Sequence, residues 1–234
     1  MPFFDHDNHS LHYEICGVSD PVAYTPILML HGNGEDMTVF GDTVAHLLNS
    51  NTIILLDSRM HGRSVPFEGA SAELHYSDMA DDALALMEYL GAGEYDVVGY
   101  SDGGIIALMM AMRSMSIRKV ITIGANTDPG GLTLRARLMM KRARSRALAI
   151  GDERTQELQR LMLEEPHITL SDLSRIIAEV TVIRGSRDPF IKLRHSEQIA
   201  DAIPHGSHMS VEGAGHGIPE THAAQLAEIM RTVL

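Results

Sequence analysis

A serine flanked by glycines is the residue of this chain best placed to act as a nucleophile. Ser101 lies in Gly99-Tyr100-Ser101-Asp102-Gly103, between an apolar run that enters and an apolar run that leaves. A serine hydroxyl attacks a carbonyl only when a base takes its proton and donors stabilise the developing negative charge. A strand, a sharp turn and a helix would expose that hydroxyl and bring a helix N-terminus to the charge. We therefore predict such a turn, with Gly99 and Gly103 where side chains would collide.

The base that this serine needs is best supplied by His216. It follows the last predicted strand and lies in a glycine-rich segment, residues 213–217, that opens the last predicted helix. Three neighbouring histidines are rivals, but they lie before, within or beyond the strand pattern: His205, His208 and His222.

Asp188 is the candidate for the carboxylate that orients the histidine. It also ends a predicted strand, in the segment 185–189, and Pro189 stiffens the turn there. The alternative interpretation is an aspartate that only caps a helix or a turn. Asp128, after the preceding strand, is a rival for the orienting role.

The elements that must position these residues alternate along the chain, which predicts an α/β fold with a mostly parallel sheet covered by helices on both faces. Continuous apolar runs predict strands that are buried on both faces. The predicted strands are 11–16, 27–30, 52–56, 96–100, 119–123, 180–184 and 207–211, and the predicted helices are 37–48, 77–90, 103–113, 191–202 and 219–233, with Ser77 as the N-cap of the second helix.

Residues 126–175 break this alternation, because they contain no strand signal. Apolar residues recur there with helical period, and six basic residues lie between Arg135 and Arg146. We predict one helix that ends at Gly151 and further helices at 152–163 and 169–178. The chain is thus a core, 1–125 and 176–234, with a helical insertion over the carboxyl ends of the strands, where ligands bind in open α/β sheets.

Five segments in this order resemble the α/β-hydrolase family over nearly the whole chain. They are His31-Gly32-Asn33-Gly34, the Asp57–Ser64 loop, the turn at Ser101, Gly185 with Asp188, and Gly215-His216. The resemblance implies a Ser101, His216 and Asp188 triad and an oxyanion hole made by the backbone N–H groups of Asn33 and Asp102. It also implies structural roles for His31 and for the loop 57–64, and it makes residues 126–175 a cap.

The function implied by the resemblance is hydrolysis of a small carboxylic ester through an acyl-enzyme, without a metal or an organic cofactor. Cofactor-free haloperoxidases (perhydrolases) and C–C bond hydrolases use the same triad and remain alternatives. A ligand-binding receptor on a hydrolase scaffold is the non-enzyme alternative. Haloalkane dehalogenases are disfavoured, since they need an aspartate nucleophile and tryptophans, and the chain has no tryptophan.

Asp102 bears on the substrate, because a carboxylate beside the nucleophile would favour a cationic group. The segment is similar to that of amino-acid-ester hydrolases, which predicts an amine near the scissile carbonyl. The alternative is that Asp102 caps the helix that follows. The basic residues of the insertion favour the opposite charge, either an anionic substrate or a surface for attachment. The alternative is that they only form the solvated face of a helix. Apolar residues that are candidates for an acyl pocket are Phe40, Leu134, Leu138, Met139 and Met140.

The amino-acid composition argues against several classes of binding partner. The chain has 234 residues, 44% of them hydrophobic and 21% charged, and a net charge of −12 disfavours nucleic acid and anionic membranes. Cys16 is the single cysteine, which favours a reducing compartment, and no signal peptide, membrane span or metal motif is evident. We expect a cytoplasmic enzyme acting on a small-molecule ester; the sequence leaves the oligomeric state open, a homodimer included.

Overall fold

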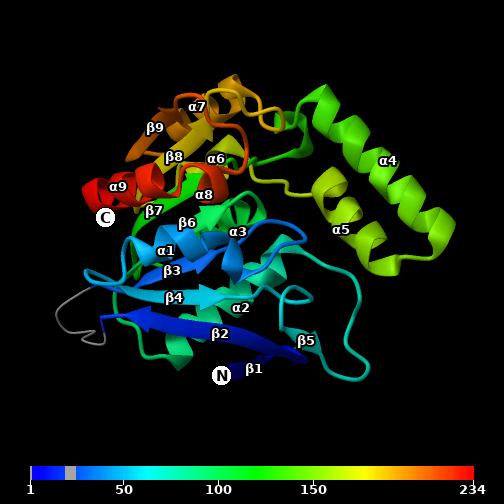
Figure 1. The fold of residues 1–234 in the computed structure, drawn as a ribbon, viewed down its shortest axis with the longest axis horizontal. Helices are drawn as coiled ribbons and strands as arrows, with labels where there is room; N and C mark the ends of the chain where they lie inside the picture. Colours follow the sequence, from blue (N-terminus) through cyan, green and yellow to red (C-terminus); the bar gives the residue numbers. More distant parts are fainter. Residues whose placement is uncertain (1, 19–24) are drawn as a thin grey trace.

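The computed structural model describes residues 2–18 and 25–234, in which nine strands form one sheet (Figure 1). The strands are β1 (Phe3–His6), β2 (His9–Gly17), β3 (Ile27–Leu30), β4 (Thr52–Leu56), β5 (Val65–Pro66), β6 (Tyr95–Tyr100), β7 (Ile117–Ile123), β8 (Glu179–Gly185) and β9 (Gly206–Val211). Their order is β1-β2-β4-β3-β6-β7-β8-β9, with β5 paired to β2 outside this path. Pairing is parallel from β4 through β9 and antiparallel for β2. The predicted mostly parallel sheet is therefore confirmed.

Helices cover both faces of the sheet because its strands are apolar on both sides. Leu28 and Leu30 of β3 pack in one core cluster, while Ile27 and Met29 pack in another on the opposite face. The first cluster includes residues of α2 (Tyr76–Tyr89), α3 (Asp102–Ala111) and α7 (Leu193–Ala202). The second includes residues of η1 (Met37–Phe40), α1 (Gly41–Ala45), α8 (Ile218–Thr221) and α9 (Ala223–Val233).

Some element boundaries differ from the prediction. The segment 5–10 contains a hairpin turn at Asp7 and Asn8, both with positive φ, between β1 and β2, and β1 was not predicted. Helix α2 begins at Tyr76 with His75 as its N-cap, so the prediction of Ser77 as the cap was wrong. Because Tyr76 is completely buried, the helix starts one residue earlier and carries that ring into the core.

The insertion contains η2 (Pro129–Gly131), α4 (Leu134–Ile150), α5 (Glu153–Glu164) and α6 (Leu170–Leu173). Figure 1 shows α4 and α5 side by side, beyond the end of the sheet at which the parallel strands finish. Gly151 ends α4 in the left-handed conformation, as predicted for a helix C-terminus. The last helix of the insertion is shorter than predicted; Thr169 and Asp172 form a capping box at its start.

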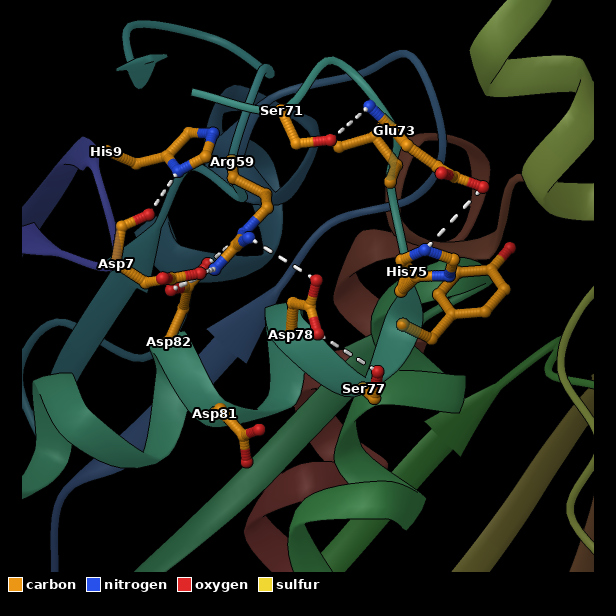
Figure 2. Close-up of polar contacts among 12 residues, drawn as sticks. Asp7, His9, Arg59, Ser71, Glu73, His75, Ser77, Asp78, Asp81 and Asp82 are labelled. Carbon is orange, nitrogen blue, oxygen red and sulfur yellow. Dashed lines mark hydrogen bonds and ion pairs between the residues drawn. The ribbon is translucent and has the colours of Figure 1, made fainter. Parts of the chain in front are cut away.

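The loop after β4 is anchored to α2 by a buried ion pair, which Figure 2 shows. Arg59 donates to both carboxylate oxygens of Asp82, at 2.7 and 2.8 Å, and to Asp7 at 3.1 Å. Asp57 in the same loop accepts from the backbone N–H groups of Met37 and Arg63, each at 2.9 Å. These contacts fix the loop that leaves the carboxyl end of β4.

None of the helices in the described ranges combines the length and the apolar character that crossing a bilayer requires.

Candidate active site

The turn at Ser101 has the predicted form of a strand, a sharp turn and a helix. Strand β6 ends at Tyr100 and α3 begins at Asp102, with Ser101 between them at φ +52°. This positive φ is rare for a residue with a side chain and points to a constrained functional position. A Cβ on Gly99 would lie 2.1 Å from the carbonyl oxygen of Gly103, and a Cβ on Gly103 would lie 2.0 Å from that of Leu30. Both glycines are therefore required by close backbone contacts.

His216 lies within hydrogen-bond distance of both Ser101 and Asp188. His216 Nδ1 lies 2.8 Å from the Asp188 carboxylate, and its Nε2 lies 3.1 Å from Ser101 Oγ. With the proton on Nδ1 shared with Asp188, Nε2 is free to accept from the serine hydroxyl. The two partners follow β9 and β8, so neighbouring parallel strands deliver them to the same edge of the sheet.

The Asp188 carboxylate is held in its ionised form. Burial alone would raise its pKa, but hydrogen bonding and charge attraction from His216 hold the pKa below its ordinary value. The backbone N–H groups of Phe190 and Ile191 add hydrogen bonds of 2.7 and 3.1 Å to the same carboxylate. Arg184 fixes the loop by donating to the carbonyl oxygens of Asp188 and Ile191, both at 3.0 Å. Asp188 can therefore orient His216 as an anion.

Two backbone N–H groups near the serine have no backbone acceptor. Within residues 2–18 and 25–234, neither Asn33 N–H nor Asp102 N–H donates a backbone hydrogen bond. Asp102 is the first residue of α3, where helix N–H groups have no intrahelical partner and the helix dipole favours negative charge. These are the donors that the resemblance assigns to an oxyanion hole.

The Asp102 side chain does not cap α3. The N-cap is Ser101, and Asp102 Oδ2 instead accepts a 2.8 Å hydrogen bond from the Asn33 side chain. Burial raises the pKa of Asp102 to about 6, while the hydrogen bond from Asn33 opposes that shift. The expectation that this side chain caps the helix was therefore wrong, although its charge still lies in the first turn, where the helix dipole favours it.

A cavity of about 300 Å³ opens at Ser101 and His216. Its apolar wall comes partly from the loops beside the triad and partly from the insertion, where Met140 of α4 and Met162 of α5 line it. Its charged wall consists of carboxylates. The apolar wall contains Leu132, Met140, Met162, Phe190 and Ile191, and the carboxylates are those of Glu35, Asp102 and Glu220.

Four of the residues expected in an acyl pocket do not line this cavity. Phe40, the last residue of η1, is completely buried in the core. Leu134, Leu138 and Met139 lie on the outer face of α4, with 64%, 45% and 48% of their surfaces exposed. The inward face of α4 is Ala136, Met140 and Ala147, so a helical period alone did not reveal which face turns toward the core.

The basic residues of α4 also lie away from the cavity. Arg135, Arg142 and Arg146 line a depression on the outer side of the helix, and Arg144 pairs with Glu164 of α5 at 3.0 Å. Among the described residues that line the cavity at Ser101, none is a lysine or an arginine.

The rival residues lie elsewhere. Asp128 caps η2 by accepting from Gly130 N–H, and it lies 4.0 Å from His195 rather than beside His216. Within the described residues, no three histidine, cysteine or carboxylate side chains converge as a metal site would require.

Sequence reasoning missed Glu35, Glu220, Met162, Phe190 and Ile191. Sequence position gives a signal for three of these residues. Phe190 and Ile191 directly follow the loop of Asp188. Glu35 directly follows the His31-Gly32-Asn33-Gly34 segment. Met162 and Glu220 reach the cavity only through the packing of α5 and α8, which no local pattern reveals.

Comparison with known proteins shows the family. The family described as alpha/beta hydrolase fold matches residues 25–159, more than half of the chain. The chain therefore belongs to the α/β-hydrolase family. It is an enzyme of the hydrolase class.

Individual relatives are distant or partial. The human serine hydrolase BPHL is 35% identical over 118 residues, which cover 50% of this chain and 40% of that protein. A Haemophilus influenzae protein with the provisional name esterase/lipase is 20% identical over 95% of this chain and 86% of its own length. A solved carboxylesterase of Nitrososphaera gargenis has a TM-score of 0.84 at 20% identity, covering 99% of this chain and 97% of that chain, and so shares the fold.

Proposed function

We propose that this hydrolase cleaves a small carboxylic ester through an acyl-enzyme formed on Ser101. The observation that carries the proposal is the continuous hydrogen-bonded arrangement from Asp188 through His216 to Ser101, at 2.8 and 3.1 Å, facing a cavity. The likeness to a relative named as a serine hydrolase supports a serine nucleophile.

The mechanism follows from this arrangement. Ser101 Oγ attacks the ester carbonyl carbon while His216 Nε2 takes the hydroxyl proton, and Asp188 stabilises the imidazolium that forms. The N–H groups of Asn33 and Asp102 bind the oxyanion of the tetrahedral intermediate. His216 then gives its proton to the leaving alcohol. A water molecule, deprotonated by the same histidine, then attacks the acyl carbon. The bond between that carbon and Ser101 Oγ breaks, His216 returns the proton to Oγ, and the carboxylic acid leaves.

We assign residues 126–175 the role of a cap that closes the cavity over the core, 1–125 and 176–234. Support comes from Leu132, Met140 and Met162, which reach the cavity from this segment. A cavity of about 300 Å³ lies at the small end of ligand pockets, which favours short acyl groups.

A series of p-nitrophenyl esters with acyl chains of increasing length tests the proposal. We expect the highest kcat/KM for short chains and a loss of at least about 10³-fold in Ser101→Ala. A fluorophosphonate probe should label the wild-type protein and leave Ser101→Ala unlabelled. Ester hydrolysis that survives this substitution would rule out Ser101 as the nucleophile.

A further inference from the structure

The charged groups around the catalytic cavity are almost all carboxylates. Glu35, from the loop after β3, and Glu220, from α8, line the cavity together with Asp102. A second depression of the surface shares Glu35 and Glu220 and continues outward past Asp36 and Asp42. Apart from His216, the described residues that line these two hollows include no basic side chain. An acidic surface therefore leads from the outside to Ser101.

Glu35 brings a carboxylate oxygen close to the nucleophile. A Cβ placed on Gly32 would lie 2.7 Å from Glu35 Oε2 and 3.2 Å from the Cβ of Ser101, so both atoms flank the same point. Glu35 Oε2 is buried, and it has no hydrogen-bond partner among the described residues. A buried polar atom without a partner is costly unless a ligand or water satisfies it.

Glu220 faces the same space from α8. A Cβ on Gly217 would lie 3.0 Å from Glu220 Oε2 and 3.9 Å from the Tyr100 hydroxyl, next to the turn of Ser101. Burial and then the negative charge of Glu220 raise the pKa of Glu35 to about 7. Two carboxylates that repel each other beside an open cavity would both be stabilised by a cation placed between them.

The third carboxylate is already engaged. Asp102 accepts a hydrogen bond from the Asn33 side chain, whereas neither Glu35 nor Glu220 forms an ion pair within the part of the chain that the structure describes. None of the basic residues of α4, which favoured an anionic substrate, lines the cavity, and Arg135, Arg142 and Arg146 lie on the outer side of the helix.

We propose that Glu35 and Glu220 form an anionic subsite beside Ser101 that selects esters carrying a cationic group, such as a protonated amine or a quaternary ammonium. The proposal rests on the proposed esterase function and names its substrate class. Asp36 and Asp42, in the outer depression, would attract the same cation during its approach, because a cleft lined by one sign of charge concentrates the opposite ion.

Isosteric ester pairs that differ only in charge test the subsite. The first pair is p-nitrophenyl 4-(trimethylammonio)butanoate and p-nitrophenyl 5,5-dimethylhexanoate, with the charge on the acyl side. The second is acetylcholine and 3,3-dimethylbutyl acetate, with the charge on the alcohol side. We expect kcat/KM to favour the cationic member at least about ten-fold in one pair at pH 8, and this preference to fall to within about two-fold in Glu35→Gln/Glu220→Gln.

A matched control separates the subsite from the net charge. Glu94 and Glu197 are exposed and lie outside both hollows, so Glu94→Gln/Glu197→Gln changes the net charge equally and should keep the preference. Equal rates for both members of both pairs in the wild type, or an equal preference in both double variants, would overturn the inference and leave the esterase function standing.

Labelling of Ser101 distinguishes the remaining outcomes. If no ester is hydrolysed and the fluorophosphonate does not label Ser101, the proposed function fails, and the inference fails with it. If Ser101 is labelled but no ester turns over, tetraethylammonium should slow labelling of the wild type and of the control variant. The absence of that protection, or its persistence in Glu35→Gln/Glu220→Gln, would overturn the subsite.

Discussion

At the scale of single residues, the side chain of Asn33 joins the two proposed oxyanion donors. Its amide donates to the Asp102 carboxylate at 2.8 Å and to the Leu158 carbonyl of α5 at 3.3 Å. The two residues that supply the backbone N–H groups are thereby tied to each other and to the insertion. A side-chain contact of this kind sets the position of backbone donors, and oxyanion stabilisation depends strongly on that position.

Exchange of the two side chains tests this positioning. Asn33→Asp places two carboxylates face to face, and we expect kcat at pH 8 to fall about 10- to 100-fold with little change in KM. Asn33→Asp/Asp102→Asn restores a donor and an acceptor and should recover kcat to within a few-fold. Steady-state kinetics with p-nitrophenyl acetate measures both variants, and melting temperatures check that they fold. An undiminished kcat in the single variant, or no recovery in the double variant, contradicts the role.

The raised pKa of Glu35 also predicts how the stability of the folded protein depends on pH. Burial, then the charge of Glu220 and, to a smaller extent, that of Asp102 raise its pKa from 4.5 to about 7. A hydrogen bond with the backbone of Gly32 and the charge of His216 oppose this rise. The folded protein thus holds this proton more tightly than the unfolded chain, so the contribution of Glu35 to stability is present below about pH 4.5 and is lost as the pH rises to about 7.

Removal of this charge should therefore stabilise the protein at alkaline pH. We expect Glu35→Gln to raise the free energy of unfolding by about 1–2 kcal/mol at pH 8 and by much less at pH 5, after a discount for partial solvation. Urea denaturation at both pH values measures the difference, with the exposed Glu197→Gln as the control. A gain of the same size at both pH values would show that the charge is not its cause.

At the scale of elements, the ion pair between Arg59 and Asp82 joins the loop after β4 to helix α2. Only 4% of Arg59 and 1% of Asp82 is exposed, and both carboxylate oxygens of Asp82 accept from the guanidinium. His6 of β1 lies 2.8 Å from the same carboxylate, so the N-terminal hairpin shares this anchor. Figure 2 shows Asp81, the residue before Asp82 on α2, pointing away from this group.

The neighbouring aspartates supply a matched pair of substitutions. Asp82→Asn removes the buried counter-charge of Arg59 and leaves only the more exposed carboxylates of Asp7 and Asp78 beside the guanidinium. We expect this substitution to cost about 3 kcal/mol of unfolding free energy. Asp81→Asn removes a surface pair with Arg113 and should cost less than about 1 kcal/mol. Chemical denaturation measures both changes. Equal costs would mean that burial of the Arg59 pair does not contribute to stability.

In the insertion, the sequence pattern predicted a helix but not which of its faces is buried. The period of α4 and its end at Gly151 were evident from the sequence, but the choice of inward face was not. Leu134, Leu138 and Met139 are as apolar as Met140, and only packing against α5 and the loop around Ile191 turns Met140 inward. A residue pattern defines the period of a helix, whereas its neighbours define its rotation about the axis.

At the scale of the whole molecule, the sequence by itself determined seven of the nine described strands, the positions of the main helices and the resemblance to the family, but not β1 or β5. The largely apolar runs at β3 and β4 predict strands that need cover on both faces, and every residue of both strands is buried. Ser101, Asp188 and His216 were found as candidates because each follows a strand, and parallel strands end at one edge of the sheet.

Only the tertiary structure decided the character of the cavity. Glu35 and Glu220 are 185 positions apart in the sequence and carry no motif, yet the packing of α8 against η1 brings both to the mouth of the site. The Asn33 side chain, not the helix end, engages Asp102, and Arg135, Arg142 and Arg146 of α4 turn outward. Side chains from several separate elements together set the charge and the shape of a cavity, so local sequence patterns do not determine them.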